Sequence, residues 1–505
     1  MYEKDVPTKL RRYDLLSFSV CTEAKKLQQL LEGRLIKETK TLLRPPDEKH
    51  QVFFIDDLHM ARTDKWKVQG ANELFRQYLD YQGWYNLEKI YFKKVRDVNF
   101  VTTLSTRHQS KELVSERVCW HLGAIGVINF EGCHVEQIYH FILAKAFMNV
   151  NSNVVLTQAP AMLLKASLEF FSKYNESLKP SPTMFLFKLN TRHMLMLLKA
   201  FLDAPVSYFQ MIEHVAFLWV SEVCRTVIDR HADAAEQDRL YETAKRIAME
   251  AFSVRPKIFP REHHLPQFFY GQPESEHTYN EVLEERKLAS LLNDTLEAYN
   301  KAHYSEQISV IIFNTLIEKT LKINRALLMP MANTILVADQ GSGAYELVKI
   351  AIQLARANGM QLFQSDSEQS EDWRASLRSI VAKVGLEARS VCVLHLIENH
   401  FVEDVMQTLD AIAAHGELFQ IFSPEEFESV LNQVRYKTFH SNVRGKERTE
   451  AQLIEEVREH LHLHLHLLLQ LGPRSKTLLS KLREAPHLLD SSTLIYFGEW
   501  SDYGY

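Results

Sequence analysis

The sequence has few cysteines, and they lie far apart. Only five occur in 505 residues, and no two have the spacing of a zinc site or of a disulfide framework. An odd number of isolated thiols predicts a reducing, cytosolic compartment. No stretch reaches the roughly 18 consecutive apolar residues that a membrane-spanning helix needs. The first residues also lack the apolar core of a secretory signal.

An excess of charge of one sign is also missing. The chain has 59 Lys and Arg against 64 Asp and Glu, a net charge of −5 with both signs mixed throughout. This balance gives no electrostatic reason to expect nucleic acid as a partner. The apolar fraction of 46% and the charged fraction of 24% are typical of a globular protein. At about 150 residues per domain, the length allows three or four compact units.

Two carboxylates end an apolar segment near the N-terminus. Residues 52–55 are apolar, and Asp56 and Asp57 follow them directly. This pattern favours a strand buried on both faces of a parallel sheet, whose carboxyl edge is where such folds place ligands. One carboxylate could hold Mg²⁺ through its waters and the next could polarise an attacking water, as in the Walker B motif of nucleoside triphosphatases. The alternative is a strand that stops at a solvated turn.

A glycine-containing loop follows a second apolar segment, residues 335–337. The loop leads into a helix predicted from residue 347, and strand, loop and helix together form the geometry of a phosphate-binding loop. Three residues keep its shape: Gly341, Ser342 and Gly343. An active loop has a cation after its last glycine, but Ala344 stands there. The loop is therefore predicted to be degenerate.

Acidic residues add to this defect. Asp339 and Glu346 lie where a polyphosphate would sit, and like charges about 4 Å apart repel by about 4 kcal/mol at an effective dielectric near 20. The matching second apolar strand, residues 391–397, is followed by Glu398 without a preceding Asp. We therefore expect weak or absent nucleotide binding at this second site, and no hydrolysis.

Short segments elsewhere support this interpretation by their order. They are Glu73-Leu74-Phe75-Arg76-Gln77, Trp84-Tyr85, Leu218-Trp219-Val220-Ser221-Glu222-Val223, Asp229-Arg230, Tyr279-Asn280-Glu281-Val282, Leu296-Glu297-Ala298-Tyr299-Asn300, Asp372-Trp373-Arg374, His415-Gly416-Glu417 and Phe497-Gly498-Glu499-Trp500. Taken with the two sites, the sequence resembles the third and fourth AAA+ units of dynein heavy chains over essentially its whole length. The likeness is closer to axonemal than to cytoplasmic members.

The resemblance implies an α/β fold with two AAA+ (P-loop NTPase-like) parallel-sheet cores separated by a helical lid and a linker. The expected divisions are a partial third-unit-like core without its phosphate loop (1–136), the lid (137–262), the linker with further helices (263–328), and a fourth-unit-like core (329–505). Alternating strand and helix patterns in the flanks, with helical periodicity between them, agree with these divisions.

Two arginines receive roles from the same resemblance. Arg117 matches the arginine finger, which reaches the nucleotide of the neighbouring unit and stabilises transition-state charge. Arg192 matches the sensor-two arginine, and residues 101–105 occupy the place of sensor one. Each arginine could equally be an ordinary salt-bridging residue.

Four histidines alternate with leucines near the C-terminus: His460, His462, His464 and His466. On a strand all four imidazoles would face one side, where neighbouring rings could hold Zn²⁺ or Ni²⁺. No cysteine or paired acidic ligand accompanies them. We therefore interpret this run as the strand before sensor one of the second core, and we predict no metal site.

By resemblance the chain is a ring segment of a minus-end-directed microtubule motor. Its expected partners are other AAA+ units or dynein-complex subunits, with the microtubule contacted only indirectly and neither nucleic acid nor membrane involved. The expected location is the cytoplasm and cytoskeleton, including the axoneme of a cilium or flagellum. The family implies ATP and Mg²⁺, but with incomplete motifs we expect no hydrolysis by this chain alone.

Three hypotheses remain open. The chain is a fragment of a longer motor, or a truncated, non-catalytic dynein-related interaction protein, or a nucleotide-binding regulatory ATPase that uses Asp56 and Asp57. The sequence does not identify the dynein subclass, the cargo or the light chains.

Overall fold

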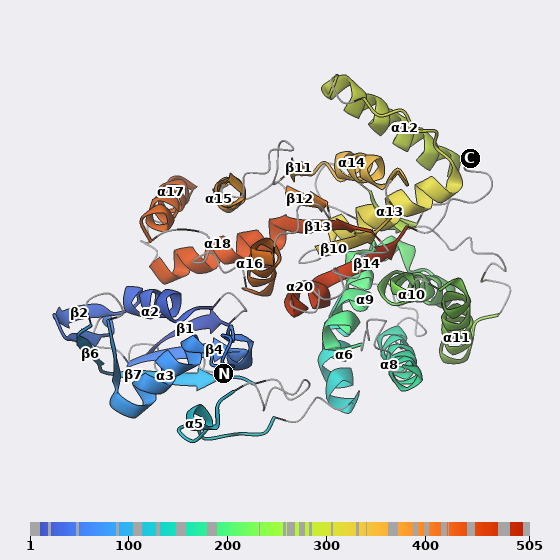
Figure 1. The fold of residues 1–505 in the computed structure, drawn as a ribbon. Helices are drawn as coiled ribbons and strands as arrows, with labels where there is room; N and C mark the ends of the chain where they lie inside the picture. Colours follow the sequence, from blue (N-terminus) through green and yellow to red (C-terminus); the bar gives the residue numbers. More distant parts are fainter. Residues whose placement is uncertain are drawn as a thin grey trace.

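Two α/β units and a helical lid make up the structure (Figure 1). The computed structural model describes residues 11–18, 22–46, 50–86, 90–104, 114–127, 132–147, 158–178, 189–231, 233–255, 259, 268–271, 278–281, 285–304, 307–329, 333–339, 341–361, 372–386, 392–397, 403–415, 422, 424–441, 450–472 and 485–497. In Figure 1 the N-terminal unit lies at the lower left, the lid at the lower right, and the C-terminal unit above them.

A three-stranded parallel sheet forms the centre of the N-terminal unit. Its strands, in spatial order, are β1 (Arg11–Ser17), β4 (His50–Asp56) and β7 (Val98–Thr102). Phe53 and Ile55 are fully buried on one face of β4, and on its other face Val52 is buried and Phe54 is half-buried. The expected parallel sheet, with the two carboxylates at the end of its central strand, is confirmed.

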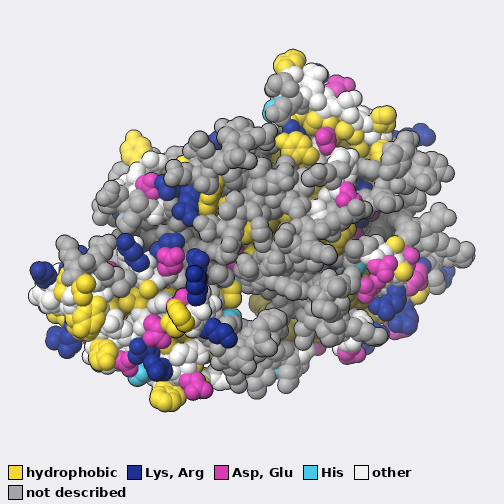
Figure 2. All heavy atoms as spheres, in the orientation of Figure 1, with side chains coloured by type: hydrophobic (Ala, Val, Ile, Leu, Met, Phe, Trp, Pro, Cys, Tyr) yellow, Lys and Arg dark blue, Asp and Glu magenta, His cyan; other side chains and the backbone are white. Residues whose placement is uncertain are grey.

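A smaller mixed sheet and short helices complete this unit. The sheet has the order β2 (Ile36–Thr39), β3 (Leu42–Arg44), β6 (Phe92–Val95) and β5 (Gly83–Tyr85). The helical elements are α2 (Ala24–Gly33), η2 (Leu58–Met60), α3 (Gly70–Tyr81) and α5 (Glu116–Cys119). Figure 2 shows Lys and Arg side chains interspersed with hydrophobic ones over this unit.

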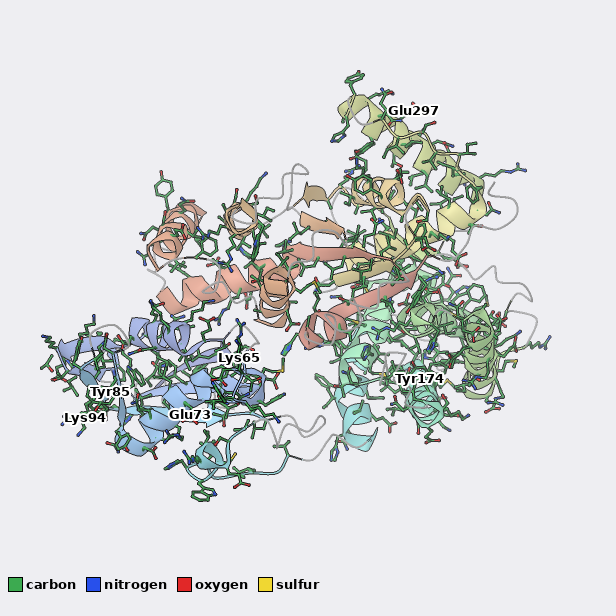
Figure 3. All side chains as sticks on the ribbon, in the orientation of Figure 1. Lys65, Glu73, Tyr85, Lys94, Tyr174 and Glu297 are labelled. Atoms are coloured by element: carbon green, nitrogen blue, oxygen red, sulfur yellow. The ribbon has the colours of Figure 1, made fainter. Side chains whose placement is uncertain are left out.

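The turn after α3 requires glycine at one position. Gln82 adopts the left-handed conformation that ends the helix, and a Cβ on Gly83 would lie 2.3 Å from the carbonyl oxygen of Lys93. This close approach places Trp84 in the core, where its indole N–H donates to Glu32 Oε1 at 3.0 Å. Figure 3 shows Glu73, Tyr85 and Lys94 around this part of the unit.

Five helices form the lid. They are α6 (Gly132–Phe147), α8 (Ala159–Ser177), α9 (Thr191–Asp203), α10 (Ile212–Thr226) and α11 (Ala234–Phe252). Their apolar faces meet around Trp219, which is fully buried and donates from its indole nitrogen to Ser167 Oγ at 2.9 Å. A capping box between Asn190 and His193 begins α9, because it satisfies amides that the first turn leaves unpaired.

A hairpin and two helices connect the lid to the second sheet. The hairpin strands are β8 (Phe268–Gly271) and β9 (Thr278–Glu281), and the helices are α12 (Glu285–Ala302) and α13 (Asn314–Leu328). Short 3₁₀ turns, η3 (Val206–Tyr208) and η4 (Ile228–Arg230), lie beside α10. Strand β9 brings Tyr279 into the lid core.

The C-terminal unit has a five-stranded, all-parallel sheet. In spatial order its strands are β11 (Asn358–Gln361), β12 (Cys392–Ile397), β13 (Leu465–Leu471), β10 (Asn333–Val337) and β14 (Ser492–Tyr496). The helices are α14 (Ala344–Leu354), α15 (Asp372–Leu386), α16 (Glu403–His415), α17 (Pro424–Ser441), α18 (Glu450–His464) and α20 (Pro486–Ser491). Strand β10 comes first in the chain but lies between β13 and β14, so the strand order reverses beside it. In open parallel sheets, ligands bind at such a switch point.

The histidine run is not a continuous strand, and that prediction is wrong. Helix α18 extends to His464, and β13 begins only at Leu465. His460 and His464 therefore lie one helical turn apart, with ring centroids separated by 6.2 Å. The reason is that Leu453, Val457 and Leu461 are buried at the four-residue spacing of a helix, which continues through the alternating segment.

The four imidazoles consequently do not share one face. His466 lies on β13 and is buried, while the side chain of His462 is outside the described residues. Among the described side chains, no group of three His, Cys, Asp or Glu is placed to hold a metal ion.

Two further sequence features concern membranes and thiols. Among the described residues, no helix combines the length and the apolar character needed to span a membrane. Cys119 is an exposed free thiol, and Cys224 is a buried one. Burial raises the pKa of the Cys224 thiol to about 12, so this side chain stays protonated and packs as a small apolar group.

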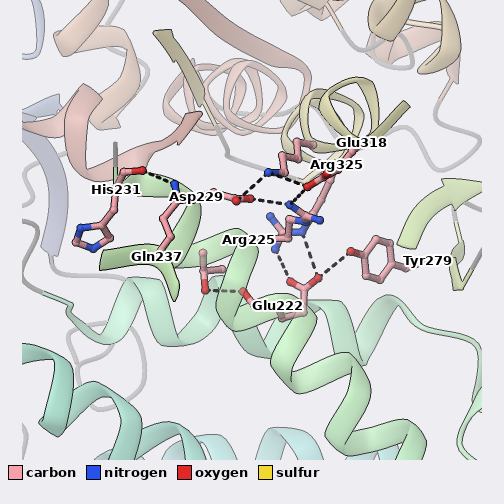
Figure 4. A network of polar contacts seen from close by, with 10 residues as sticks. Glu222, Arg225, Asp229, His231, Gln237, Tyr279, Glu318 and Arg325 are labelled. Carbon is pink, nitrogen blue, oxygen red and sulfur yellow. Dashed lines mark hydrogen bonds and ion pairs between the residues drawn. The ribbon is translucent and has the colours of Figure 1, made fainter. Parts of the chain in front are cut away.

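A buried ion pair joins the lid to α13 (Figure 4). Glu222 on α10 is fully buried, and its carboxylate accepts hydrogen bonds from both the Nη2 and the Nε of Arg325. The hydroxyl of Tyr279 donates to the same carboxylate at 2.8 Å. Both charges are thus removed from water, and each depends on the other for compensation.

A second cluster continues the contact along the same two helices. Arg225 on α10 lies 2.9 Å from Asp229, and Lys322 on α13 lies 3.0 Å from Asp229 and 3.1 Å from Glu318. Burial opposes ionisation of Asp229, but Lys322 and Arg225 outweigh it and hold the pKa of this carboxyl below its usual value. The lid and α13 are therefore joined by four paired charges in addition to the Glu222–Arg325 pair.

Removing one partner of the buried pair should destabilise the protein strongly. Glu222→Ala leaves the Arg325 guanidinium buried without compensation, so we expect the free energy of unfolding to fall by about 3–5 kcal/mol in urea titrations. The double variant Glu222→Leu/Arg325→Met should cost less than the single one, because no charge remains stranded. Glu297→Ala, at an exposed pair on α12 (Figure 3), is the control, with an expected change within about 0.5 kcal/mol. Equal effects of Glu222→Ala and Glu297→Ala would contradict this account.

Candidate functional site

The two carboxylates lie at the carboxyl edge of the first sheet, and Thr103 holds them. The Thr103 hydroxyl donates to Asp56 Oδ1 and accepts from the backbone N–H of Asp57 at 3.0 Å. Asp57 has a φ of 53° and a ψ of 53°, a left-handed conformation that Asp adopts more readily than most residues. The segment assigned to sensor one by resemblance thus contacts the carboxylate pair directly.

A residue of the C-terminal unit also reaches this site. His487 on α20 places its Nε2 3.2 Å from Asp57 Oδ2. On the other side of the same carboxylate, His59 Nδ1 lies 3.8 Å from Asp57 Oδ1. Asp57 therefore lies between two imidazoles, one from each unit.

These neighbours do not fit a magnesium site in this arrangement. Mg²⁺ is held by oxygen ligands in near-ideal octahedral geometry and keeps several waters. Here Asp56 accepts from a hydroxyl, and Asp57 faces imidazole nitrogens, which suit transition metals better than magnesium. The pair keeps the position of a Walker B motif but has the surroundings of a structural contact.

The glycine loop of the second sheet has left-handed backbone at both glycines and leads into a helix. Gly341 and Gly343 have φ values of 81° and 74°, in the left-handed region that favours glycine. The N–H of Ser342 bonds to the carbonyl of Asp339 at 3.2 Å. Helix α14 begins at Ala344, three residues before the predicted start, so the loop leads directly into a helix N-terminus.

The side chains of this loop do not complete a phosphate site. Ala344 is buried in the slot where a cation would stand, and Glu346 lies in the first turn of α14. Lys349, farther along α14, is 4.5 Å from the ring centre of Tyr345. Asp339 is exposed beside the loop. Glu398, the carboxylate predicted for this site, lies outside the described residues.

One buried lysine near this sheet edge was not predicted. Lys319 on α13 donates to the carbonyl of Phe497 at 2.5 Å and lies 4.4 Å from the centre of its ring. The N–H of Phe497 bonds in turn to Val337 at the end of β10. Burial and the nearby Lys322 lower the pKa of Lys319 to about 8. A single lysine on an amphipathic helix gives no sequence signal that it will be buried against the carbonyl of Phe497.

Neither predicted arginine is placed against the carboxylates or the glycine loop. Arg117 on α5 and Arg192 on α9 are both exposed. Arg192 bonds through its backbone N–H to Asn190 Oδ1 at 3.0 Å, as part of the cap of α9. Within the described part of the chain, no contact joins either arginine to Asp56 or Asp57.

His193, the buried residue next to Arg192, contacts Arg230. Arg230 Nη1 lies 2.8 Å from His193 Nε2, and Arg230 Nη2 donates to the carbonyl of Ser492 at 3.3 Å. The lid is thereby bonded to β14 of the second sheet. The segment containing Arg230 was noted in the sequence, but a bond to a strand 262 residues later has no local signal.

Two family models match the chain on either side of the lid. Residues 2–130 match a P-loop containing dynein motor region, and residues 308–503 match the P-loop containing dynein motor region D4. Together they cover well over half of the chain. The chain belongs to the dynein heavy-chain family. Its two α/β units are AAA+ cores, and the lid lies between them.

Similar proteins include axonemal and flagellar dyneins. Dynein axonemal heavy chain 1 of Mus musculus and dynein axonemal heavy chain 6 of Homo sapiens are each 24% identical to the chain, over 502 and 497 residues. The dynein-1-beta heavy chain of the flagellar inner arm I1 complex of Chlamydomonas reinhardtii is 24% identical over 493 residues. Each comparison covers 96% of this chain but only 11% or 12% of the relative.

The hydroxyl of Thr103 should be required for the geometry of the carboxylate pair. Thr103→Val keeps the side-chain shape but removes one donor and one acceptor, so we expect a loss of about 1–3 kcal/mol in the free energy of unfolding. Thr102→Val, at the last residue of β7 and next to Thr103, is the matched control and should change stability by less. Urea titration followed by tryptophan fluorescence measures both. If the two variants behave alike, Thr103 does not hold the pair.

His193 should make stability depend on pH. Burial and the Arg230 charge lower the pKa of His193 to about 3 from an ordinary value near 6.5, so the unfolded chain binds more protons between these values. The contribution of neutral His193 to the free energy of unfolding is complete above pH 6.5. It is lost as pH falls, by about 2 kcal/mol between pH 6.5 and 5. Unfolding titrations at pH 5, 6 and 7 should show a shallower dependence for His193→Gln than for the unchanged protein. An unchanged slope would exclude His193 as the cause.

Proposed function

We propose that this chain is a ring segment of a dynein heavy chain, the minus-end-directed motor on microtubules, and that it contributes architecture rather than hydrolysis. One observation carries the proposal: the lid that follows the first core is bonded to the core that comes next in the chain. Glu222 of the lid contacts Arg325 on the connecting helix α13, and Arg230 of the lid contacts Ser492 of the C-terminal unit. Successive AAA+ units joined in this way are what a ring built from one polypeptide needs.

The state of both nucleotide sites supports an architectural role. In the first, the carboxylate of Asp57 faces His487. In the second, Ala344 stands where an active loop has a basic side chain, and Glu346 adds negative charge beside the loop. ATP with Mg²⁺ is therefore a ligand of the family that this chain binds weakly or not at all. Hydrolysis for movement would come from another unit of the ring.

The relatives suggest a place in the cell. Those compared above carry the words axonemal or flagellar in their names. The proposed location is accordingly the axoneme of a cilium or flagellum, and the proposed partners are other AAA+ units and subunits of a dynein complex. Contact with the microtubule would be indirect.

Nucleotide binding tests the architectural role. Thermal unfolding of the purified chain should not shift with millimolar MgATP, whereas a ligand at about 100 times its dissociation constant adds about 2.7 kcal/mol. The variant Ala344→Lys/Tyr345→Thr restores a cation and a hydroxyl after Gly343, so it should gain a shift if those two positions withhold binding. A shift in the unchanged protein that Asp57→Asn abolishes would instead favour the regulatory ATPase.

The full-length transcript tests the ring-segment assignment. We expect an open reading frame that continues through this chain into adjoining motor units. A transcript that encodes this chain alone would favour the non-catalytic, dynein-related interaction protein.

A further inference from the structure

A polar contact joins the first carboxylate site to the C-terminal unit. Asp57 Oδ2 and His487 Nε2 are 3.2 Å apart, and the two side chains are 27% and 18% exposed. The pair is therefore only partly accessible to water, which strengthens the attraction relative to a fully exposed pair.

The helix that carries His487 is fixed from behind. The N–H of Leu488 donates to Oδ1 of Asp410 at 2.8 Å, and Asp410 is buried on α16. Helix α16 packs against α20 and also contacts β1 of the N-terminal unit. His487 thus lies where the two units also meet through α16 and β1, on a helix that Asp410 holds in place.

The opposite side is equally fixed. Thr103 holds the backbone of Asp57, and the left-handed conformation of this residue turns the chain directly after β4. His59 contacts the other carboxylate oxygen at 3.8 Å from within the same unit. The orientation of the carboxylate is therefore set by its own unit, and the approach of the second unit is set by His487.

We propose that Asp57 is a docking residue whose pairing with His487 attaches the first AAA+ core to the second. The proposal goes beyond the ring-segment assignment and holds whether or not nucleotide binds. It follows from the geometry: the imidazole of His487 lies 3.2 Å from a carboxylate whose backbone is held by its own unit.

Hydrogen–deuterium exchange on the whole chain tests the docking. His487→Ala should raise amide exchange in the peptide that covers residues 54–62, and Asp57→Asn should raise it in the peptide that covers residues 485–492. Each change then appears in the unit that was not altered, because the contact protects both sides. His487→Gln keeps an N–H donor and should restore protection.

Controls separate docking from a general loss of structure. His460→Gln, on α18 of the same unit, should leave the peptide over residues 54–62 unchanged. The double variant Asp57→Asn/His487→Ala should exchange no faster than either single variant, since one contact is lost in all three. Changes confined to the altered peptide, or additive effects in the double variant, would overturn the docking role.

Discussion

The pairing of Glu222 with Arg325 is the interaction on which the arrangement of the lid depends. Both charges are buried, so separating the lid from α13 would leave each in a low-dielectric interior without compensation. The neighbouring contacts of Asp229 with Lys322 and of Arg230 with Ser492 act in the same direction. The lid is consequently bonded to α13 and to β14 of the second core, although the resemblance assigns the lid and that core to different units.

The first core is attached by weaker means. Asp57 and His487 are both partly exposed, unlike Glu222 and Arg325, whose side chains are 0% and 4% exposed. Separating the lid from α13 would therefore strand more buried charge than separating Asp57 from His487.

The parts of the fold that local chemistry determines could be predicted from the sequence. The apolar segments ending at Ile55 and Val337 are strands of parallel sheets, and Gly341 and Gly343 have the positive φ that a loop before a helix requires. The histidine run was wrongly predicted to be a strand, because its seven alternating residues fit both the strand period of two and the helical spacing of four. Only the buried residues before the run show that a helix continues into it. His487 could not be predicted, since its role depends on how two units dock and not on its neighbours in sequence.

The carboxylate pair shows why a motif alone does not assign a role. Two adjacent acidic side chains at a sheet edge repel each other and need positive charge or donors nearby, whether or not a metal ion supplies them. In this chain a hydroxyl serves Asp56 and an imidazole of the next unit serves Asp57. Each member of the pair thus has a neighbouring polar group that the chain itself supplies. What distinguishes a catalytic from a structural pair is the group that faces the second carboxylate, and here that group is a side chain.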